Sequence, residues 1–505
     1  MGWARTATAL GAVVVAAVLL LSGGSGADPE TPAGLPGMPP PFLGVAVLGD
    51  GGLTAAVDAY GDVVDLRAPG PAGRALIDNS AGRQAAGSVA GDTGIQVRVQ
   101  VGREVLPMWR ADSIRQRFVS GTNVLRTVAT FGAARVVVRQ AARGEALAML
   151  VRGSGVTLRV NADIDCEQGR SYRALAVVCS AEQPASAMDR LLGQAAAADR
   201  RWLLRSRPLG PGAPGWSRRM YFRSLLVLRA LTDRRTGAVA AGARDGWAYV
   251  WPRDASAAAI AYAAAGYRRE AERVTQFLLG LGLKDAARFY GDGSPVPGRA
   301  AQGDAIGWVA AASRAAGLIG SARHAARILG GGGPVPWRDR ADYWEGAPGD
   351  YLGNAIASGE VAIKHLYGAK LPVRLERDPA DPKSGLDSAA AWAVRPFTRP
   401  RLYPAVRNTL SRLVAHRTPY GITPGEGWSG GEDPWSAPTA WTAWSLAALG
   451  ERPDALRLMQ ALRRSATPAG DLPERVDAKT GIPRSTTPLA WSHAFAILAL
   501  RELWP

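Results

Sequence analysis

The segment ASAMDRLLGQAAAADRRWLLRSRPLGPGAPG, residues 185–215, separates two halves of the chain with different sequence patterns. Its first part places apolar residues at helical spacing, and it ends in a run of proline and glycine that stops a helix. Short apolar runs divided by turn residues precede it, and alanine- and leucine-rich stretches of helical length follow it. The segment therefore predicts a boundary near residue 186 between a β-rich part and a helical part.

Residues 42–185 are predicted to form an antiparallel β-sandwich. The stretches GIQVRVQV (94–101) and VTLRVNADI (156–164) alternate apolar and polar residues, as strands with one buried face do. No helical pattern of useful length interrupts the succession of such strands. A run of short strands without intervening helices favours two packed antiparallel sheets.

Residues 186–214 are predicted to be a linker helix with its Pro/Gly end, and residues 215–505 an all-helical domain. About eleven alanine- and leucine-rich segments follow residue 215, many of them ending at glycine or proline. Paired helices on this scale form either a toroid or an α-solenoid. The absence of a repeat of fixed period disfavours the solenoid.

The N-terminus predicts export. Residues 1–27 contain an arginine and a short apolar run, and they end in small residues, which is typical of a signal peptide or a membrane anchor. Residues 28–41 are rich in proline and predict a semi-rigid linker. We expect an extracellular or cell-surface protein whose only membrane contact is this N-terminal segment, if it is uncleaved.

The two cysteines, Cys166 and Cys179, lie near the outer ends of a predicted hairpin. In an exported protein such a pair predicts a disulfide, the alternative being two buried free thiols. The four histidines are widely separated, and the sequence has neither a CxxC nor an HExxH motif. No metal site and no cofactor are therefore expected.

The formal net charge of +17 raises the question of a nucleic-acid partner. Nucleic-acid binding needs basic residues in a run or on one face, because affinity comes from neutralising neighbouring phosphates. The basic residues here are almost all arginine and are scattered along the chain. We therefore expect no nucleic-acid partner.

Four loops that precede predicted helices concentrate tryptophan, glycine and carboxylates. They are RDGWAYVWPRDASAA (244–258), YWEGAPGDYLGN (343–354), YGITPGEGWSGGEDPWSAPTAW (420–441) and LPERVDAKTGIPRSTTPLAWSHAF (472–495). Aromatic faces cover the apolar faces of sugars, and charged side chains bind their hydroxyl groups. Loops on a rigid scaffold are common places for binding and catalytic sites. From the residues alone, Asp254 is equally well explained as a helix cap.

The order of these four motifs resembles glycoside hydrolase family 15, which contains glucoamylases, glucodextranases and bacterial trehalases. The stretch VLGDGGLTAAVDAYGDVVDLRAPGP (47–71) is similar to the start of the β-sandwich of its prokaryotic members. The resemblance extends from about Phe42 to the C-terminus. It implies an N-terminal antiparallel β-sandwich followed by a C-terminal (α/α)6 catalytic barrel.

The resemblance also implies roles for individual residues. Glu345 takes the place of the general acid and Glu474 that of the general base of an inverting glycosidase. The residues that match sugar-binding or sugar-lining positions are Trp251, Arg253, Asp254, Gln302, Trp344 and Trp435. The implied activity is hydrolysis of terminal α-D-glucosidic bonds in oligo- or polysaccharides, with an α-glucan or α-glucoside as substrate.

Two departures from the family pattern leave the substrate open. Gly346 stands where most members have a second acidic residue, and an arginine expected before the glycine-rich loop has no clear counterpart. Trehalose- or dextran-specific hydrolysis is therefore an alternative, as is a glycan-binding relative with impaired catalysis. A phosphorylase is disfavoured, because a carboxylate at Glu474 would repel the incoming phosphate.

Overall fold

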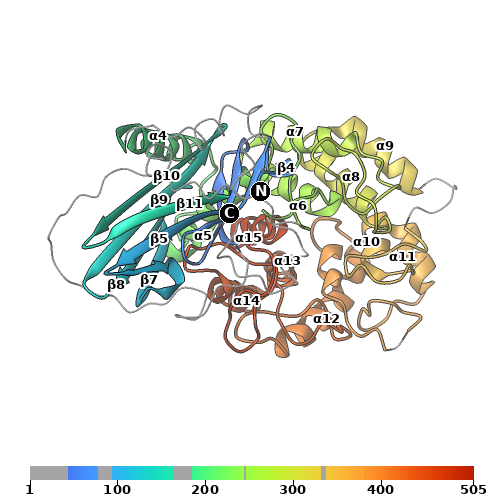
Figure 1. Ribbon diagram of the computed structural model, residues 1–505. Coiled ribbons are helices and arrows are strands. Elements are labelled where there is room, and N and C mark those ends of the chain that lie inside the picture. The colour runs from blue at the N-terminus through green and yellow to red at the C-terminus, as the bar shows by residue number, and fades with distance from the viewer. Residues whose placement is uncertain (1–43, 78–93, 164–184, 244–245, 331–336, 382) are drawn as a thin grey trace.

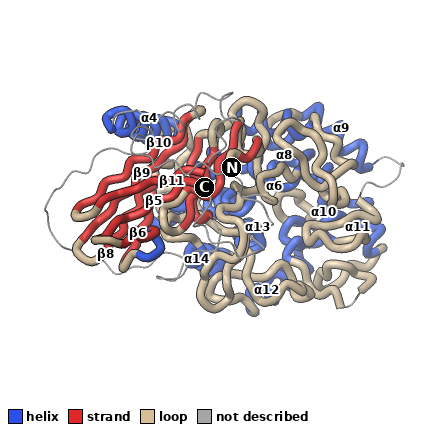
Figure 2. Tube along the Cα trace, viewed as in Figure 1, coloured by secondary structure: helices blue, strands red, loops and turns tan. Residues whose placement is uncertain are grey.

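The computed structural model describes residues 44–77, 94–163, 185–243, 246–330, 337–381 and 383–505. Its strands lie on one side of the molecule and most of its helices on the other (Figures 1 and 2). The prediction of an N-terminal β part followed by a helical part is therefore confirmed. The predicted signal peptide or anchor, the linker 28–41 and the predicted Cys166–Cys179 disulfide lie outside the described residues.

The described strands form two antiparallel sheets. One has the order β1-β2-β3-β5-β11, with β4 paired to β3 and β6 paired to β5, and the other has the order β10-β9-β8-β7. The strands are β1 Gly44–Gly49, β2 Thr54–Asp58, β3 Val63–Ala68, β4 Arg74–Ala75, β5 Gly94–Val101, β6 Glu104–Pro107, β7 Ser113–Phe118, β8 Leu125–Phe131, β9 Ala134–Arg143, β10 Ala146–Ser154 and β11 Thr157–Asp163. A short 3-10 helix, η1 Met108–Arg110, follows β6.

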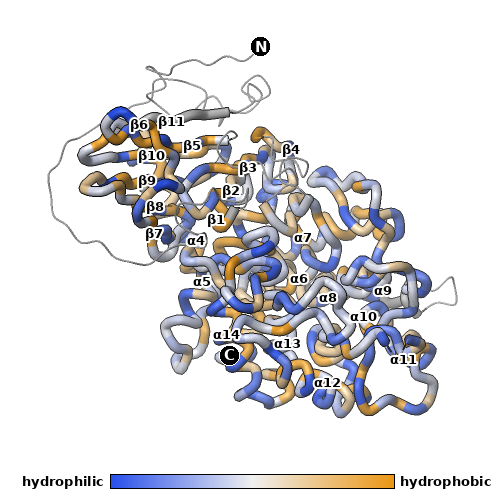
Figure 3. The backbone as a smooth tube through the Cα atoms, turned by 60° about the horizontal axis from the view of Figure 1, so that its bottom comes forward, coloured by the Kyte–Doolittle hydropathy of each residue, from blue (hydrophilic) through white to orange (hydrophobic). Residues whose placement is uncertain are grey.

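One hydrophobic core lies between the two sheets. It joins Val97 and Val99 of β5 to Val136 and Val138 of β9, all of them fully buried. Strand β8 alternates buried and half-buried residues along its length, as the period of two requires. Hydrophobic and hydrophilic residues accordingly alternate along these strands in Figure 3. Helix α4, Ala185–Leu203, covers the other face of the four-stranded sheet by packing on β9 and β10.

The helical part contains long α-helices joined by extended loops. They are α4 Ala185–Leu203, α5 Gly215–Leu231, α6 Pro252–Ala264, α7 Arg268–Leu279, α8 Ala305–Ala315, α9 Ile319–Gly330, α10 Leu352–Ser358, α11 Glu360–Tyr367, α12 Tyr403–Ala415, α13 Ser436–Ala448, α14 Arg452–Ser465 and α15 Ala490–Leu503. Two 3-10 helices, η2 Ser388–Ala393 and η3 Pro400–Leu402, complete the described set.

The helices fall into two classes by burial. Helices α6, α8, α13 and α15 are alanine-rich and buried on almost every side. Helices α7, α12 and α14 bury a single face, which is the usual pattern for a helix between core and solvent. Each inner helix α6, α8 and α13 packs against the helix that follows it. Small alanine side chains allow this close approach of helix axes.

The β part and the helical part meet through buried polar contacts. The backbone N–H of Val47 in β1 donates to the Asp471 carboxylate at 3.1 Å, and Arg223 of α5 forms an ion pair with the same carboxylate at 2.9 Å. The Asn123 side chain donates to the carbonyl of Leu226 in α5. Burial raises the pKa of Asp471 to about 6, although Arg223 opposes this effect.

Among the described residues, no helix combines the length and the apolar character needed to cross a membrane.

Candidate active site

The segment that leads into α6 carries three aromatic residues, Trp247, Tyr249 and Trp251. Residues 246–249 form turns and bends, and Val250 exchanges two main-chain hydrogen bonds of 2.8 and 2.9 Å with Phe289. The ring centroids of Tyr249 and Trp251 lie 6.3 Å apart.

The indoles at the two ends of this segment each donate to a different predicted catalytic carboxylate. The Nε1–H of Trp247 donates to Oε1 of Glu474 at 3.2 Å, and the Nε1–H of Trp251 donates to Oε1 of Glu345 at 3.1 Å. The two carboxylates are 129 residues apart in sequence, yet both face the same short stretch of chain.

Glu345 lies at the surface of the site, with 29% of its side chain exposed. The amide of Gln302 donates to its Oε1 at 3.4 Å, and the guanidinium of Arg299 contacts its Oε2. Its backbone has a φ of 57°, in the left-handed region that costs a non-glycine residue about 1–2 kcal/mol. Backbone strain of this kind is common at functional sites.

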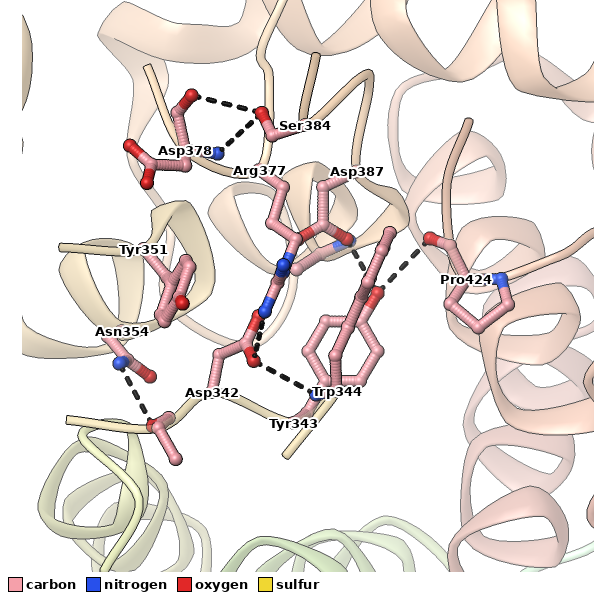
Figure 4. Close-up of polar contacts among 12 residues, drawn as sticks. Asp342, Tyr343, Trp344, Tyr351, Asn354, Arg377, Asp378, Ser384, Asp387 and Pro424 are labelled. Carbon is pink, nitrogen blue, oxygen red and sulfur yellow. Dashed lines mark hydrogen bonds and ion pairs between the residues drawn. The ribbon is translucent and has the colours of Figure 1, made fainter. Parts of the chain in front are cut away.

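The loop that carries Glu345 is held by a buried ion pair below it. Arg377 donates from Nε and from Nη2 to the two oxygens of Asp342, at 2.7 and 2.9 Å, and Asp342 also accepts from the backbone N–H of Trp344 (Figure 4). The guanidinium of Arg377 also lies 4.4 Å from the centroid of the Trp344 ring. A bidentate pair of this kind fixes direction as well as distance.

Tyr343 anchors the same loop from its other side. Its hydroxyl donates to Oδ1 of Asp387 at 2.6 Å and lies 3.1 Å from the carbonyl of Pro424 (Figure 4). Burial raises the pKa of Asp387 to about 7, while the hydrogen bond from Tyr343 opposes the shift. Burial, together with the Asp387 carboxylate, raises the pKa of Tyr343 well above its usual value, so this tyrosine stays a donor.

The loop that carries Glu474 starts from the junction of the two parts of the molecule. Asp471 is bound to β1 and α5, as described above, and the backbone N–H of Leu472 donates to Nε2 of His493 in α15 at 2.9 Å. The backbone N–H of Glu474 donates to the carbonyl of Thr486, and its carbonyl accepts from the N–H of Ser436. This loop therefore depends on β1, α5, α13 and α15.

The Glu474 side chain is half-buried and meets hydroxyl and indole donors. The Ser485 hydroxyl donates to Oε2, opposite the oxygen that Trp247 binds. Arg475, the next residue, turns toward Asp433, with 3.9 Å between the charged atoms. The positive charge of Arg475 is therefore directed to Asp433 and not to Glu474.

Arg253 and Asp254 are buried in the first turn of α6. Arg253 donates from Nη1 to Gln302 at 2.7 Å and to Asp304 at 2.9 Å. Trp251 occupies the N-cap position and Asp254 the third helical position, so Asp254 is not the cap. Burial raises the pKa of Asp254 to about 7, with Arg253 opposing the shift and the nearby Glu474 charge adding to it.

Three tryptophans connect the glycine-rich loop to the Glu345 loop. Trp344 meets Trp428 edge to face, with ring centroids 5.3 Å apart, and Trp428 meets Trp435 in the same way at 5.2 Å. Trp435 is the N-cap residue of α13, and its backbone N–H donates to the carbonyl of Ile422 at 2.8 Å. This arrangement gives Trp435 a packing role, through which it supports Trp344.

The structure thus brings together most of the residues singled out from the sequence. Glu345, Glu474, Trp251, Arg253, Asp254 and Gln302 are linked by direct contacts or near charges, while Trp344 and Trp435 flank them.

The sequence assigned no role to Arg299, Asp304, Asp342 or Arg377. It marked Trp247 only as one of the aromatic residues of the loop 244–258. The described residues contain no cluster of three or more His, Cys, Asp or Glu side chains arranged to hold a metal ion.

Comparison with known proteins identifies the family and the fold that the chain is similar to. Residues 215–288 match the family description "Glycosyl hydrolases family 15". The crystal structure of a bacterial glucoamylase complexed with acarbose is similar over 96% of both chains, with a TM-score of 0.68 at 14% identity. A glucoamylase from Saccharomycopsis fibuligera matches 56% of this chain and 94% of its own, with a TM-score of 0.45 at 15% identity. No protein of curated function matches the sequence.

The class of protein is therefore a glycoside hydrolase. The resemblance to family 15, first indicated by the order of four motifs, is confirmed by the family match and by a fold shared over almost the whole chain.

Proposed function

We propose that the protein is an exported, inverting, exo-acting α-glycosidase that hydrolyses terminal α-D-glucosidic bonds of oligo- or polysaccharides. The observation that carries the proposal is the pair of indole hydrogen bonds from Trp247 and Trp251, which orient Glu474 and Glu345 toward one segment. Two carboxylates that face a common site are what glycoside hydrolysis requires.

The two carboxyl groups have different tasks in this reaction. Glu345, when protonated, gives its proton to the leaving glycosidic oxygen, while Glu474, when ionised, removes a proton from the attacking water. In an inverting enzyme they stand ~6.5–9.5 Å apart, which leaves room for that water. Trp247 and Ser485 donate to the two oxygens of Glu474 and hold its side chain in place.

Arg253 and Asp254 are suited to bind the hydroxyl groups of the terminal sugar. A carboxyl group with a pKa of about 7 exists both protonated and ionised near neutrality, so Asp254 can donate or accept a hydrogen bond. The aromatic rings of Tyr249 and Trp251 offer apolar faces beside these polar groups. The combination resembles a sugar subsite more than a purely structural cluster.

We further propose that the helical part is a (α/α)6 barrel. The contacts among the described elements support a closed circuit of inner elements, in the order α6, α8, α10, η2, α13, α15 and back to α6. The outer helices α5, α7, α9, α11, α12 and α14 each pack on one or two members of this circuit. The candidate residues lie on the loops that lead into these inner elements or, for Arg253 and Asp254, in the first turn of α6.

The domain division and the location follow from the sequence. We propose a signal peptide or anchor at 1–27, a linker at 28–41, a β-sandwich at 42–185, a linker helix at 186–214 and the barrel at 215–505. Export is consistent with a polymeric α-glucan substrate, and the acarbose-bound glucoamylase of the same fold supports an α-glucan ligand.

The test is sugar release from maltose, isomaltose, trehalose and longer glucans by the wild type and by the Glu345→Gln and Glu474→Gln variants. We expect glucose release from at least one α-glucoside by the wild type, and a loss of about 10²–10⁴-fold in each variant. Unchanged activity in both variants would remove the assignment of the pair.

A second candidate is a glycan-binding relative with impaired catalysis. The contact between Arg299 and Glu345 favours it, because a guanidinium opposes protonation of the acid. This candidate predicts that the wild type binds maltooligosaccharides in calorimetry but releases no glucose from any of them.

A further inference from the structure

Arg299 occupies an unusual position for a residue next to a general acid. Its guanidinium contacts Oε2 of Glu345, while 42% of its side chain remains exposed. A guanidinium in contact with a carboxylate stabilises the ionised form of that carboxylate. A general acid must be protonated to act, so this contact has to be exchanged for another one during each turnover.

A second arginine, Arg288, lies on the same side of the site. Its guanidinium carbon is 4.8 Å from the ring centroid of Tyr249 and 5.6 Å from that of Trp251. Its Nη1 donates to the carbonyl of Gly246 at 3.4 Å, and its buried Nε has no hydrogen-bond partner. No carboxylate of the described residues lies within ion-pair distance of it.

The two arginines are close enough to influence each other. Burial lowers the pKa of Arg299, the positive charge of Arg288 lowers it further, and the charge of Glu474 opposes the shift. Two guanidinium groups repel each other, and an anion that lies between them removes this repulsion. A neutral sugar cannot supply such an anion.

Arg377 shows what a structural arginine of this site looks like. It is 16% exposed and bound to the buried Asp342 through two hydrogen bonds. Arg299 instead shares its carboxylate with the predicted chemistry, and Arg288 has no carboxylate partner among the described residues.

We propose that Arg299 and Arg288 bind an acidic group on the leaving-group side of the substrate, so that the enzyme prefers α-D-glucosides of acidic aglycones. Arg299 then leaves Glu345 for the substrate anion, and Glu345 becomes free to take up its proton. The leaving-group side is indicated because Glu345 is the carboxyl group that protonates the departing oxygen. This inference rests on the proposed α-glucosidase function.

The matched substrates are maltobionate and maltitol. Both carry a terminal α-glucose on the same open-chain aglycone, which ends in a carboxylate in the first and in a neutral CH2OH group in the second. We expect the wild type to show a kcat/KM for maltobionate about tenfold or more above that for maltitol, as a charged hydrogen bond at this site would give. Arg299→Gln and Arg288→Gln are expected to bring this ratio close to one.

Arg457→Gln is the matched control, because Arg457 is also half-exposed and also paired with a carboxylate, Asp454, but on the outer helix α14. It should keep the wild-type ratio. A wild-type ratio of one or below would overturn the proposal, as would a ratio that persists in both Arg299→Gln and Arg288→Gln. Efficient hydrolysis of an α-glucuronide with a neutral aglycone would overturn the leaving-group placement.

Failure of the glycosidase function gives a different result. In that case neither substrate is cleaved, and calorimetry of the wild type with maltobionate and maltitol decides the matter. Tighter binding of maltobionate that is lost in Arg299→Gln would reject hydrolysis and keep the acidic ligand. Equal binding of both compounds would reject the acidic ligand as well.

Discussion

The loops that carry Glu345 and Glu474 are supported in different ways. The Glu345 loop belongs to the helical part alone and rests on the side-chain pair Arg377–Asp342, with its acid in a left-handed backbone conformation. The Glu474 loop is bound by its backbone and by Asp471 to β1, α5 and α15. The first is a partly exposed loop held from below, and the second is part of the junction between the two parts.

This difference has a consequence for the role of the β part. Because β1 contacts Asp471, three residues before Glu474, the sheet helps to place the proposed base. Within the described part of the chain, the contacts given above for the proposed acid all come from the helical part. A base must be held accurately against a water molecule, and rigid support on several elements provides that accuracy. An acid that exchanges partners benefits from a looser position.

The largest expected effect distinguishes the acid from the base, because the loss of activity in each variant depends differently on the leaving group. Glu345→Gln should lose about 10³-fold activity on maltose but much less on α-D-glucosyl fluoride, whose leaving group needs no proton. Glu474→Gln should lose a similar factor on both substrates, because water must still be activated. Steady-state kcat/KM values on the two substrates measure this.

If Glu345→Gln lost activity equally on both substrates and Glu474→Gln lost much less on the fluoride, the two roles would be exchanged. A variant whose loss of activity does not depend on the leaving group has lost the base. Equal losses on fluoride and maltose in both variants would contradict the assignment of either residue as the acid.

The second prediction removes the two indole hydrogen bonds one at a time. Trp247→Phe and Trp251→Phe each delete one donor to Glu474 or Glu345 and keep most of the aromatic surface. A carboxylate that loses a donor holds its proton more tightly. We expect kcat/KM to fall about tenfold in Trp247→Phe, with the acid limb of its pH profile moved to higher pH.

Trp251→Phe should instead move the alkaline limb to higher pH, because that limb follows deprotonation of the acid. The pH dependence of kcat/KM distinguishes the two variants. Identical profiles for both would show that the two indoles serve only packing.

The smallest expected effect is a change of protein stability with pH. It arises from a buried carboxyl group beneath each of the two loops. Burial raises the pKa of Asp387 to about 7 and that of Asp471 to about 6, from 3.8. The folded state therefore binds protons that the unfolded state releases, and stability should rise as pH falls from about 8 to 6. Buried His493, whose pKa is lowered well below its usual value, acts in the opposite sense below about pH 6.5.

Each such proton changes the free energy of unfolding by at most about 1.4 kcal/mol per pH unit. Thermal unfolding between pH 5 and 8 measures the slope. Asp387→Asn should flatten it, and Asp285→Asn, at an exposed position, should leave it unchanged. A melting temperature that rises with pH over the range from 6 to 8 would contradict the prediction.

The sequence predicted the two-part architecture because it leaves local signals, such as the alternation in 94–101 that indicates a half-buried strand. The roles of Glu345 and Glu474 came from the family resemblance and remain predictions, although the structure directs both carboxylates to one segment. Helix ends were harder to predict. The alanine-rich stretch 387–397, one of the segments with a helical composition, contains only the 3-10 helix η2, and Pro396, which has no backbone N–H to donate, lies beyond its end.

The supporting residues could not be predicted, because their contacts join distant parts of the chain. Arg377 binds Asp342 across 35 residues, and Trp247 binds Glu474 across 227. Nothing in the spacing around Arg299 shows that it meets Glu345, since that contact depends on how two loops pack. The sequence equally could not show that Arg475, the neighbour of Glu474, faces Asp433.

The most direct test of the central claim is the configuration of the first glucose released. Proton NMR of fresh wild-type digests of maltotriose, followed before mutarotation, distinguishes the two anomers. If Glu345 and Glu474 act as acid and base on opposite sides of the bond, the β-anomer appears first. Initial release of the α-anomer would show retention and contradict the assigned mechanism.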